Sequence, residues 1–212
     1  MATTRRKWLA ALCAAGLLAL AGGGFAVWQR AGGGPGLVTS VASLGAPFEL
    51  IDHDGKPISD AVLKGHPSLL YFGFTRCPEV CPTTLYEMSG WFEELGNEGK
   101  DIRAYFVTVD PERDDPETMK GYAEAFTDRV TGITGEPDKV FALLKAWRVY
   151  WTKVPTSDGD YTMDHTASVF MLGPDGEFEG TISYGEAKET ALEKLRLLLK
   201  KSARSLAGKA PA

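Results

Sequence analysis

Hydrophobic and polar residues alternate along the chain in blocks that predict short strands separated by amphipathic helices. The clearest block is residues 69–74, a near-continuous apolar run rich in aromatic side chains, which predicts a strand buried on both faces. Similar runs predict strands at residues 102–109 and 130–134. Apolar residues at helical spacing predict helices at residues 82–95, from residue 116, from residue 137 and at about 186–200.

Two short turn sequences predict β-hairpins at the two ends of this alternating region. An Asp-Gly pair at residues 54–55 lies between the apolar residues of 48–58, and a Pro-Asp-Gly turn at 174–176 separates 168–172 from 177–183. Alternating strands and helices imply parallel strand pairs joined by right-handed crossovers. The predicted fold class is therefore α/β and thioredoxin-like, with a central mixed sheet flanked by helices and an N-terminal hairpin.

The first 30 residues have the pattern of a membrane anchor. Basic residues at 5–7 precede an uncharged run at 8–27, which is long enough to cross a bilayer as a helix, and Trp28 and Arg30 close it. Positive charge ahead of the run predicts that everything after Arg30 is exported. The alternative is a cleaved signal peptide, with the small residues 19–21 as the cleavage site. Both interpretations put the folded part outside the cytosol.

Length and charge limit what the exported part can be. The chain has 212 residues, of which 44% are hydrophobic, so it can bury one sizeable core. We expect a flexible linker at 31–45, a folded domain at 46–205 and a tail at 206–212. The net charge is −5, and because residues 1–30 carry +4, the remainder carries −9, which argues against nucleic acid as a partner.

Two cysteines directly follow the predicted buried strand. Cys77 and Cys81 are four residues apart, and a proline follows each. Because proline disfavours helical backbone in the residue before it, Cys81 is expected at a helix N-cap, with Cys77 as the alternative cap and Pro82 as a kink. In both arrangements the thiols lie at a helix N-terminus, where unpaired N–H groups and the helix dipole lower a thiol pKa.

This thiol pair has three interpretations. A structural disulfide would close a very short loop and stabilise the fold little. A redox dithiol suits an exported protein, although the usual redox motif has two intervening residues and this one has three. A metal site is the third, because thiolates are soft ligands that suit Cu(I) or zinc, and it requires at least one further ligand.

The three histidines are the candidates for that further ligand. His53 and His66 lie in sequences typical of surface turns, and we expect them to be solvated. His165 comes just before the predicted strand 168–172, and in a thioredoxin-like fold the approach to that strand passes over the thiol pair. The residues alone leave open whether His165 is a metal ligand or a capped histidine at a strand end.

Three motifs together resemble the Sco/SenC family. They are YFGFTRCPEVCP at residues 71–82, VTVDPERD at 107–114 and DHTAS at 164–168, in that order. The resemblance covers about residues 46–199. It implies a membrane-anchored, thioredoxin-fold copper chaperone for cytochrome c oxidase, a metallochaperone first and an enzyme only in the alternative given below.

The resemblance also implies roles for individual residues. The family's metal-binding cysteines fall on Cys77 and Cys81, and its histidine ligand falls on His165. These residues are expected to bind Cu(I), and also Cu(II) with an added oxygen ligand. The acidic segment from Asp110 to Asp114 is given no role; we expect it to form a strand end followed by a helix, with Asp115 as the cap and with Asp110 or Asp114 paired to Arg113.

The partners implied by the family are cytochrome c oxidase subunit II with its CuA centre, an upstream copper donor and a thiol reductant. The implied location is the inner membrane with the domain in the periplasm, or the periplasm itself after signal cleavage. An alternative function is thiol–disulfide reduction of that subunit by Cys77 and Cys81, with no role for His165. A thiol peroxidase is disfavoured, because it needs a threonine three residues before its cysteine and Thr75 is two before Cys77.

Overall fold

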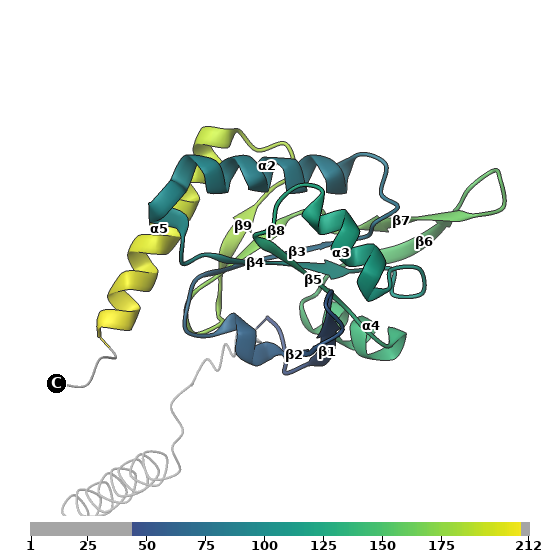
Figure 1. Cartoon of the computed structure of the whole chain (residues 1–212), viewed down its shortest axis with the longest axis horizontal. Coiled ribbons are helices and arrows are strands. Elements are labelled where there is room, and N and C mark those ends of the chain that lie inside the picture. Colours follow the sequence, from purple (N-terminus) through teal and green to yellow (C-terminus); the bar gives the residue numbers. More distant parts are fainter. Residues whose placement is uncertain (1–43, 209–212) are drawn as a thin grey trace, which may run out of the picture. The chain divides into compact units, whose positions relative to one another are not determined.

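The fold is given by a computed structural model of the chain that describes residues 44–208 (Figure 1). The predicted anchor at residues 1–30, nearly all of the predicted linker and the last four residues of the predicted tail lie outside the described residues. Within residues 44–208, no helix combines the length and the apolar character needed to span a bilayer.

A seven-stranded mixed sheet forms the centre of the fold. Its strand order is β2-β1-β5-β4-β3-β8-β9. The three middle strands β5, β4 and β3 are parallel, whereas β8 and β9 on one side and β1 and β2 on the other are antiparallel to their neighbours. The strands are β1 (Glu49–Asp52), β2 (Pro57–Ser59), β3 (Ser68–Gly73), β4 (Arg103–Thr108), β5 (Val130–Thr134), β8 (Val169–Leu172) and β9 (Phe178–Ile182).

Helices cover both faces of this sheet. They are α2 (Val80–Leu95), α3 (Pro116–Glu124), α4 (Pro137–Ala146) and α5 (Lys188–Ala207), with two short 3-10 helices, η1 (Asp60–Leu63) and η2 (Gly96–Gly99). The crossovers through α2 and α3 run in the same direction along the sheet, so a common hand places both helices on one face. Figure 1 shows α2 and α3 on that face and α4 on the opposite one.

The predicted fold class is confirmed, and the central strand β3 shows why the apolar pattern was informative. All six residues of β3 are buried. Phe72 packs against Trp147 and Phe170, with ring centroids 6.4 Å and 5.5 Å away. Because both faces of β3 are covered by side chains from helices and neighbouring strands, a continuous apolar run is the sequence that this position requires.

One element was not predicted. Strands β6 (Trp151–Pro155) and β7 (Tyr161–His165) form a separate two-stranded antiparallel sheet that does not pair with the central one. Figure 1 shows this hairpin extending beyond the central sheet. Most of its side chains are exposed or half-buried, so the sequence lacks a clear apolar period there. An Asp-Gly pair at residues 158–159 was the available turn signal.

The boundaries of two helices also differ from the predictions. Helix α2 begins at Val80 with Glu79 at its N-cap, so neither Cys81 nor Cys77 is the cap residue. Pro82 is then the third helical residue, a position whose N–H has no partner within a helix, and proline therefore costs no hydrogen bond there. Helix α5 continues to Ala207, beyond its expected end near residue 200.

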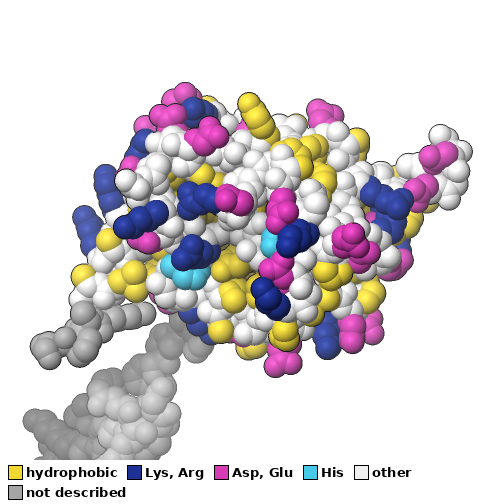
Figure 2. Space-filling view, viewed as in Figure 1, with side chains coloured by type: hydrophobic (Ala, Val, Ile, Leu, Met, Phe, Trp, Pro, Cys, Tyr) yellow, Lys and Arg dark blue, Asp and Glu magenta, His cyan; other side chains and the backbone are white. Residues whose placement is uncertain are grey.

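The surface of the described region mixes both signs of charge. On the face shown in Figure 2, lysine and arginine side chains are interspersed with aspartate and glutamate. Nucleic-acid binding depends on basic residues clustered on one face, and this face lacks that arrangement.

Candidate metal centre

The two thiols lie where β3 gives way to α2, at the carboxyl end of the central strand. Cys81 is in the first turn of α2 and is fully buried, whereas Cys77, in the loop before the helix, is half-buried. The backbone N–H of Cys81 donates a hydrogen bond to Cys77 Sγ at 3.3 Å. The sulfur of Cys77 thus takes up one of the unpaired N–H groups at the helix N-terminus, although Cys77 is not the cap residue.

The last residue of β3 makes room for the buried sulfur. A Cβ atom on Gly73 would lie 2.7 Å from Cys81 Sγ and 2.6 Å from Cε2 of Phe106. Both distances are far shorter than van der Waals contact, which is about 3.5–4.0 Å between carbon atoms. Glycine is therefore required at position 73 by the close approach of Cys81, and not by a special backbone angle.

His165 reaches the thiols from the end of β7. Its Nε2 lies 3.6 Å from Cys81 Sγ, and its Nδ1 lies 2.9 Å from the backbone oxygen of Thr166. Because a carbonyl oxygen only accepts hydrogen bonds, Nδ1 carries a hydrogen and donates a hydrogen bond to Thr166 O. In the neutral ring, Nε2 then has a lone pair directed at the sulfurs. The edge of the Phe74 ring packs against the imidazole at 5.7 Å, which further fixes its orientation.

The fold therefore brings together the three side chains predicted to bind metal. One ligand atom from each of Cys77, Cys81 and His165 lies within 4.8 Å of the others. The other two histidines have different surroundings. His53 Nδ1 accepts a hydrogen bond from the N–H of Gly132, and His66 Nδ1 lies 3.1 Å from the Ser68 hydroxyl, so both have local structural contacts instead of being simply solvated.

The two thiols have opposite acidities. Hydrogen bonding from Cys81 and from backbone N–H groups, opposed by burial, lowers the pKa of Cys77 to about 4. Burial and the neighbouring Cys77 raise the pKa of Cys81. The reduced pair therefore carries one negative charge at neutral pH, with Cys77 as thiolate and Cys81 as the thiol that donates to it.

The acidic segment after β4 contains the helix cap and the ion pair that the sequence predicted, and also a buried carboxylate that it did not. Asp115 caps α3 by accepting a hydrogen bond from the N–H of Thr118, and Asp110 pairs with Arg113 at 2.5 Å, as expected. Asp114 is fully buried and accepts hydrogen bonds from the hydroxyls of Thr75 and Thr108 at 2.6 and 2.7 Å. Burial raises the pKa of Asp114.

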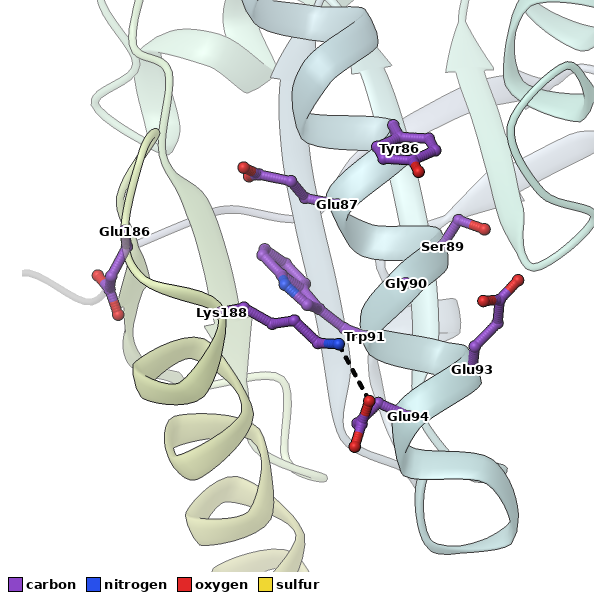
Figure 3. A pocket seen from close by; sticks show the side chains of 9 residues that line it. All are labelled: Tyr86, Glu87, Ser89, Gly90, Trp91, Glu93, Glu94, Glu186 and Lys188. Atoms are coloured by element: carbon purple, nitrogen blue, oxygen red, sulfur yellow. Dashed lines mark hydrogen bonds and ion pairs between the residues drawn. The ribbon is translucent and has the colours of Figure 1, made fainter.

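A separate groove of about 560 Å³ lies between α2 and the start of α5, and none of the three predicted ligands lines it. Figure 3 shows that its lining includes glutamates of α2 and Lys188, whose ammonium donates to Glu94 at 3.0 Å. Carboxylates favour hard cations, whereas thiolates favour soft ones. Both thiols of the described region are thus at the end of β3 and not in this groove.

These features define a class of protein: a thioredoxin-like fold with two thiols and an imidazole gathered at the end of its central strand. The profile of the SCO1/SenC family matches residues 38–200. The chain belongs to the SCO1/SenC family.

Three similar proteins illustrate the relationship. Protein SCO2, mitochondrial, of Saccharomyces cerevisiae is 35% identical over 157 residues, which cover 73% of this chain and 52% of that protein. The structure of Bradyrhizobium japonicum ScoI with copper bound is 42% identical with a TM-score of 0.68, and the match covers 74% of this chain and 99% of that one. This chain spans about half the length of the first curated relatives that it matches.

The third is BsSco, a member of the Sco family of cytochrome c oxidase assembly proteins in which a disulfide switch has been identified. It is 26% identical with a TM-score of 0.59, and the match covers 74% of this chain and 94% of that one.

Proposed function

We propose that this protein is a copper chaperone in cytochrome c oxidase assembly, which binds copper through Cys77, Cys81 and His165 and delivers it to the CuA centre of subunit II. The observation that carries the proposal is the convergence of two sulfurs and one imidazole nitrogen within 4.8 Å of one another. The copper-bound ScoI structure and the assembly role named for the BsSco family support the same conclusion.

The donor set suits Cu(I) as cargo. Thiolates are soft ligands that select Cu(I), and an imidazole adds a third donor without adding charge. Because the residues Cys77 and His165 are half-buried and not fully enclosed, the site can also admit an oxygen ligand, which Cu(II) favours. A closed structural zinc site is disfavoured, because such a site needs four protein ligands and the group contains three.

The two thiols differ in acidity, and this difference sets the order in which they bind copper. Cys77 is already a thiolate at neutral pH and provides the first ligand, whereas Cys81 holds a proton that it must lose to become the second. His165 provides Nε2, whose lone pair faces the sulfurs because Nδ1 donates to Thr166. One proton is released to solvent for each copper that binds.

Release follows from the unequal exposure of the ligands. Cys77 is half-buried in a loop, so a thiolate of the partner can approach copper on that side. Cys81 is fully buried and held by the first turn of α2, so it is the last ligand to leave. Stepwise ligand exchange then passes copper to the partner without freeing it in water.

The N-terminal segment gives this chaperone its location. Residues 1–30 anchor the chain in the inner membrane, residues 31–45 form a linker, and the domain at 46–205 lies in the periplasm; cleavage would instead leave a soluble periplasmic domain. Anchoring confines chaperone and oxidase to one membrane, which raises their effective concentration. An upstream copper donor and a thiol reductant complete the pathway, because a disulfide between the cysteines has no thiolate to offer copper.

A second function, thiol–disulfide exchange with the cysteines of subunit II, is favoured by one observation. The pKa of Cys77 is lowered to about 4, which makes it a thiolate at neutral pH, the form that attacks a disulfide, and the residue lies half-buried in its loop. The disulfide switch identified in BsSco supports this alternative.

The two functions are separated by anaerobic titration of the full chain with Cu(I), measured by competition with a chromophoric chelator. We expect one copper per reduced chain, and very weak binding once Cys77 and Cys81 are joined by a disulfide. His165→Ala should weaken copper binding and leave the rate of thiol–disulfide exchange nearly unchanged. Equal copper affinity of the oxidised and reduced chains would refute the copper function.

A further inference from the structure

The segment from Asp110 to Asp114 contacts both halves of the metal centre. It connects β4 to the residues just before α3, and none of its side chains is a predicted ligand. The sulfurs belong to the loop after β3 and the first turn of α2, whereas the imidazole belongs to the separate β6–β7 sheet. Because these two parts do not share a sheet, strand pairing cannot fix the distance between them, and contacts from another segment must do so.

The carboxyl end of the segment holds the cysteine loop. Asp114 accepts hydrogen bonds from the hydroxyl and the backbone N–H of Thr75, at 2.6 Å and 3.2 Å to its nearer oxygens. Thr75 is two residues before Cys77. Because Asp114 is fully buried and also accepts from Thr108 of β4, these bonds tie the cysteine loop to the sheet.

Asp110 and Arg113 of the same segment hold the histidine hairpin. Arg113 donates from Nε to Asp110 at 2.5 Å and from Nη1 to the backbone oxygen of Tyr161 at 2.9 Å. Its guanidinium carbon lies 3.6 Å from the centroid of the Tyr161 ring, and the Tyr161 hydroxyl donates to Asp110 at 2.8 Å. These three side chains form a closed ring of contacts, and the carboxylate of Asp110 is buried within it.

The hairpin has further contacts with the rest of the fold, among them the side chain of Met163, which is buried in the core, and the packing of His165 against Phe74. Trp151 stacks on Phe141 of α4 with ring centroids 5.7 Å apart. Lys153 pairs with Glu112, and Arg76 with Asp160, but these ion pairs are exposed on both sides, and exposed pairs contribute little. Tyr161 is the first residue of β7 and His165 is the last, so the Arg113 contacts fix the strand that ends in the predicted ligand.

We infer that Asp110, Arg113 and Asp114 are positioning residues that set the imidazole of His165 against the sulfurs, by holding the cysteine loop and the histidine hairpin from one short segment. The inference rests on the proposed copper function and adds to it. None of the three touches the metal. Arg113 acts through His165. A positive charge at position 113 is not sufficient to hold the hairpin, because Nε and Nη1 must donate hydrogen bonds to different partners at the same time.

A double-mutant cycle on the full chain tests this inference, with Cu(I) affinity as the readout. Disturbing a group that orients a metal ligand typically costs about 10- to 100-fold in affinity, and we expect a loss in that range for Arg113→Ala. In a His165→Ala background the same change should alter affinity by no more than about twofold, the usual scatter for independent sites. Arg113→Lys should lose nearly as much as Arg113→Ala, and Glu112→Gln, an exposed neighbour, should match the unmodified chain.

Tyr161→Phe provides a second route if Arg113→Ala does not fold. It removes the hydroxyl that donates to Asp110 but keeps the ring under the guanidinium, so a smaller loss of affinity is expected, again absent in the His165→Ala background. Equal losses in both backgrounds, or no loss at all, would overturn the inference.

If the proposed function is wrong, the unmodified reduced chain will bind no copper, a result that differs from those above. Amide hydrogen exchange in the copper-free chain then decides the inference. Arg113→Ala should accelerate exchange in β7, and Glu112→Gln should not. Unchanged exchange in β7 would overturn it.

Discussion

Replacing Gly73 by alanine places a methyl group between the buried sulfur and the core. The new Cβ would lie 2.7 Å from Cys81 Sγ and 2.6 Å from Phe106, so both must withdraw by roughly 1 Å to reach van der Waals distance. Phe106 has little freedom, because its ring is stacked between Tyr71 and Tyr122 with centroids 5.7 Å away on each side. The clash with Phe106 therefore strains the core, and the clash with Cys81 displaces its sulfur.

Two measured quantities should change together. Overpacking of a dense core costs about 1–3 kcal/mol, and the free energy of unfolding of Gly73→Ala should fall by that amount. Displacement of the sulfur from His165 and Cys77 should weaken Cu(I) binding by about 10- to 100-fold. Urea denaturation of the copper-free reduced chain measures the first quantity, and chelator competition measures the second.

Gly121→Ala is the matched control. Gly121 lies within α3, and a Cβ there would meet no atom within 4 Å. Alanine should raise the free energy of unfolding by about 0.5–1 kcal/mol and leave copper affinity unchanged. If Gly73→Ala bound copper as tightly as the unmodified chain and were equally stable, the close packing of Gly73 against Cys81 would be refuted.

Three further predictions follow from the acidities and contacts of the site. Copper binding to the reduced chain at pH 7 to 8 should release close to one proton per metal, since Cys77 is already ionised and Cys81 is not. Calorimetry in buffers of different ionisation enthalpy measures the number of protons released, and a number near zero or two would contradict the prediction. Thr75→Val removes a donor to the buried Asp114 and should lower the free energy of unfolding by about 1–3 kcal/mol in urea denaturation, whereas Thr75→Ser should not; equal losses would exclude the hydroxyl as the cause. Burial raises the pKa of Asp114 above its ordinary value of 3.8. The free energy of unfolding, compared with that of Asp114→Asn, should therefore be greatest below pH 3.8 and should decline as the pH rises through the pKa of the folded state. If urea denaturation showed this difference increasing with pH over that range, the pKa would be shifted in the opposite direction.

The parts of the fold that sequence reasoning could predict are those where local pattern and tertiary position agree. β3 is covered on both faces and therefore needs the apolar run from which it was predicted. The hairpins around residues 54–55 and 174–176 were also predicted, since their turn residues allow few other conformations. Asp115 followed by proline predicted the start of α3 correctly for the same reason.

The β6–β7 sheet could not be predicted in this way. Met163 is the one residue of its two strands that is buried, so its sequence carries no regular alternation of apolar and polar residues. The N-terminus of α2 was misplaced because the restriction imposed by Pro82 on Cys81 is weaker than the tertiary packing that buries Cys81 in the first turn.

The candidate site was named from residue types and a family resemblance, but its geometry depends on long-range contacts. Cys77 and Cys81 are four residues apart at the start of α2, whereas His165 lies 84 positions further along the chain than Cys81. The part played by Arg113 had no signal in the sequence beyond an acidic and basic run after a strand, because its partner Tyr161 lies in the hairpin that was not predicted.

X-ray absorption at the copper edge, on the reduced chain loaded with one Cu(I), tests the central claim most directly, because it identifies the atoms bound to the metal. The account predicts two sulfur ligands and one imidazole nitrogen, with the nitrogen absent from the spectrum of His165→Ala. A spectrum containing only sulfur ligands, or one that His165→Ala leaves unchanged, would contradict it.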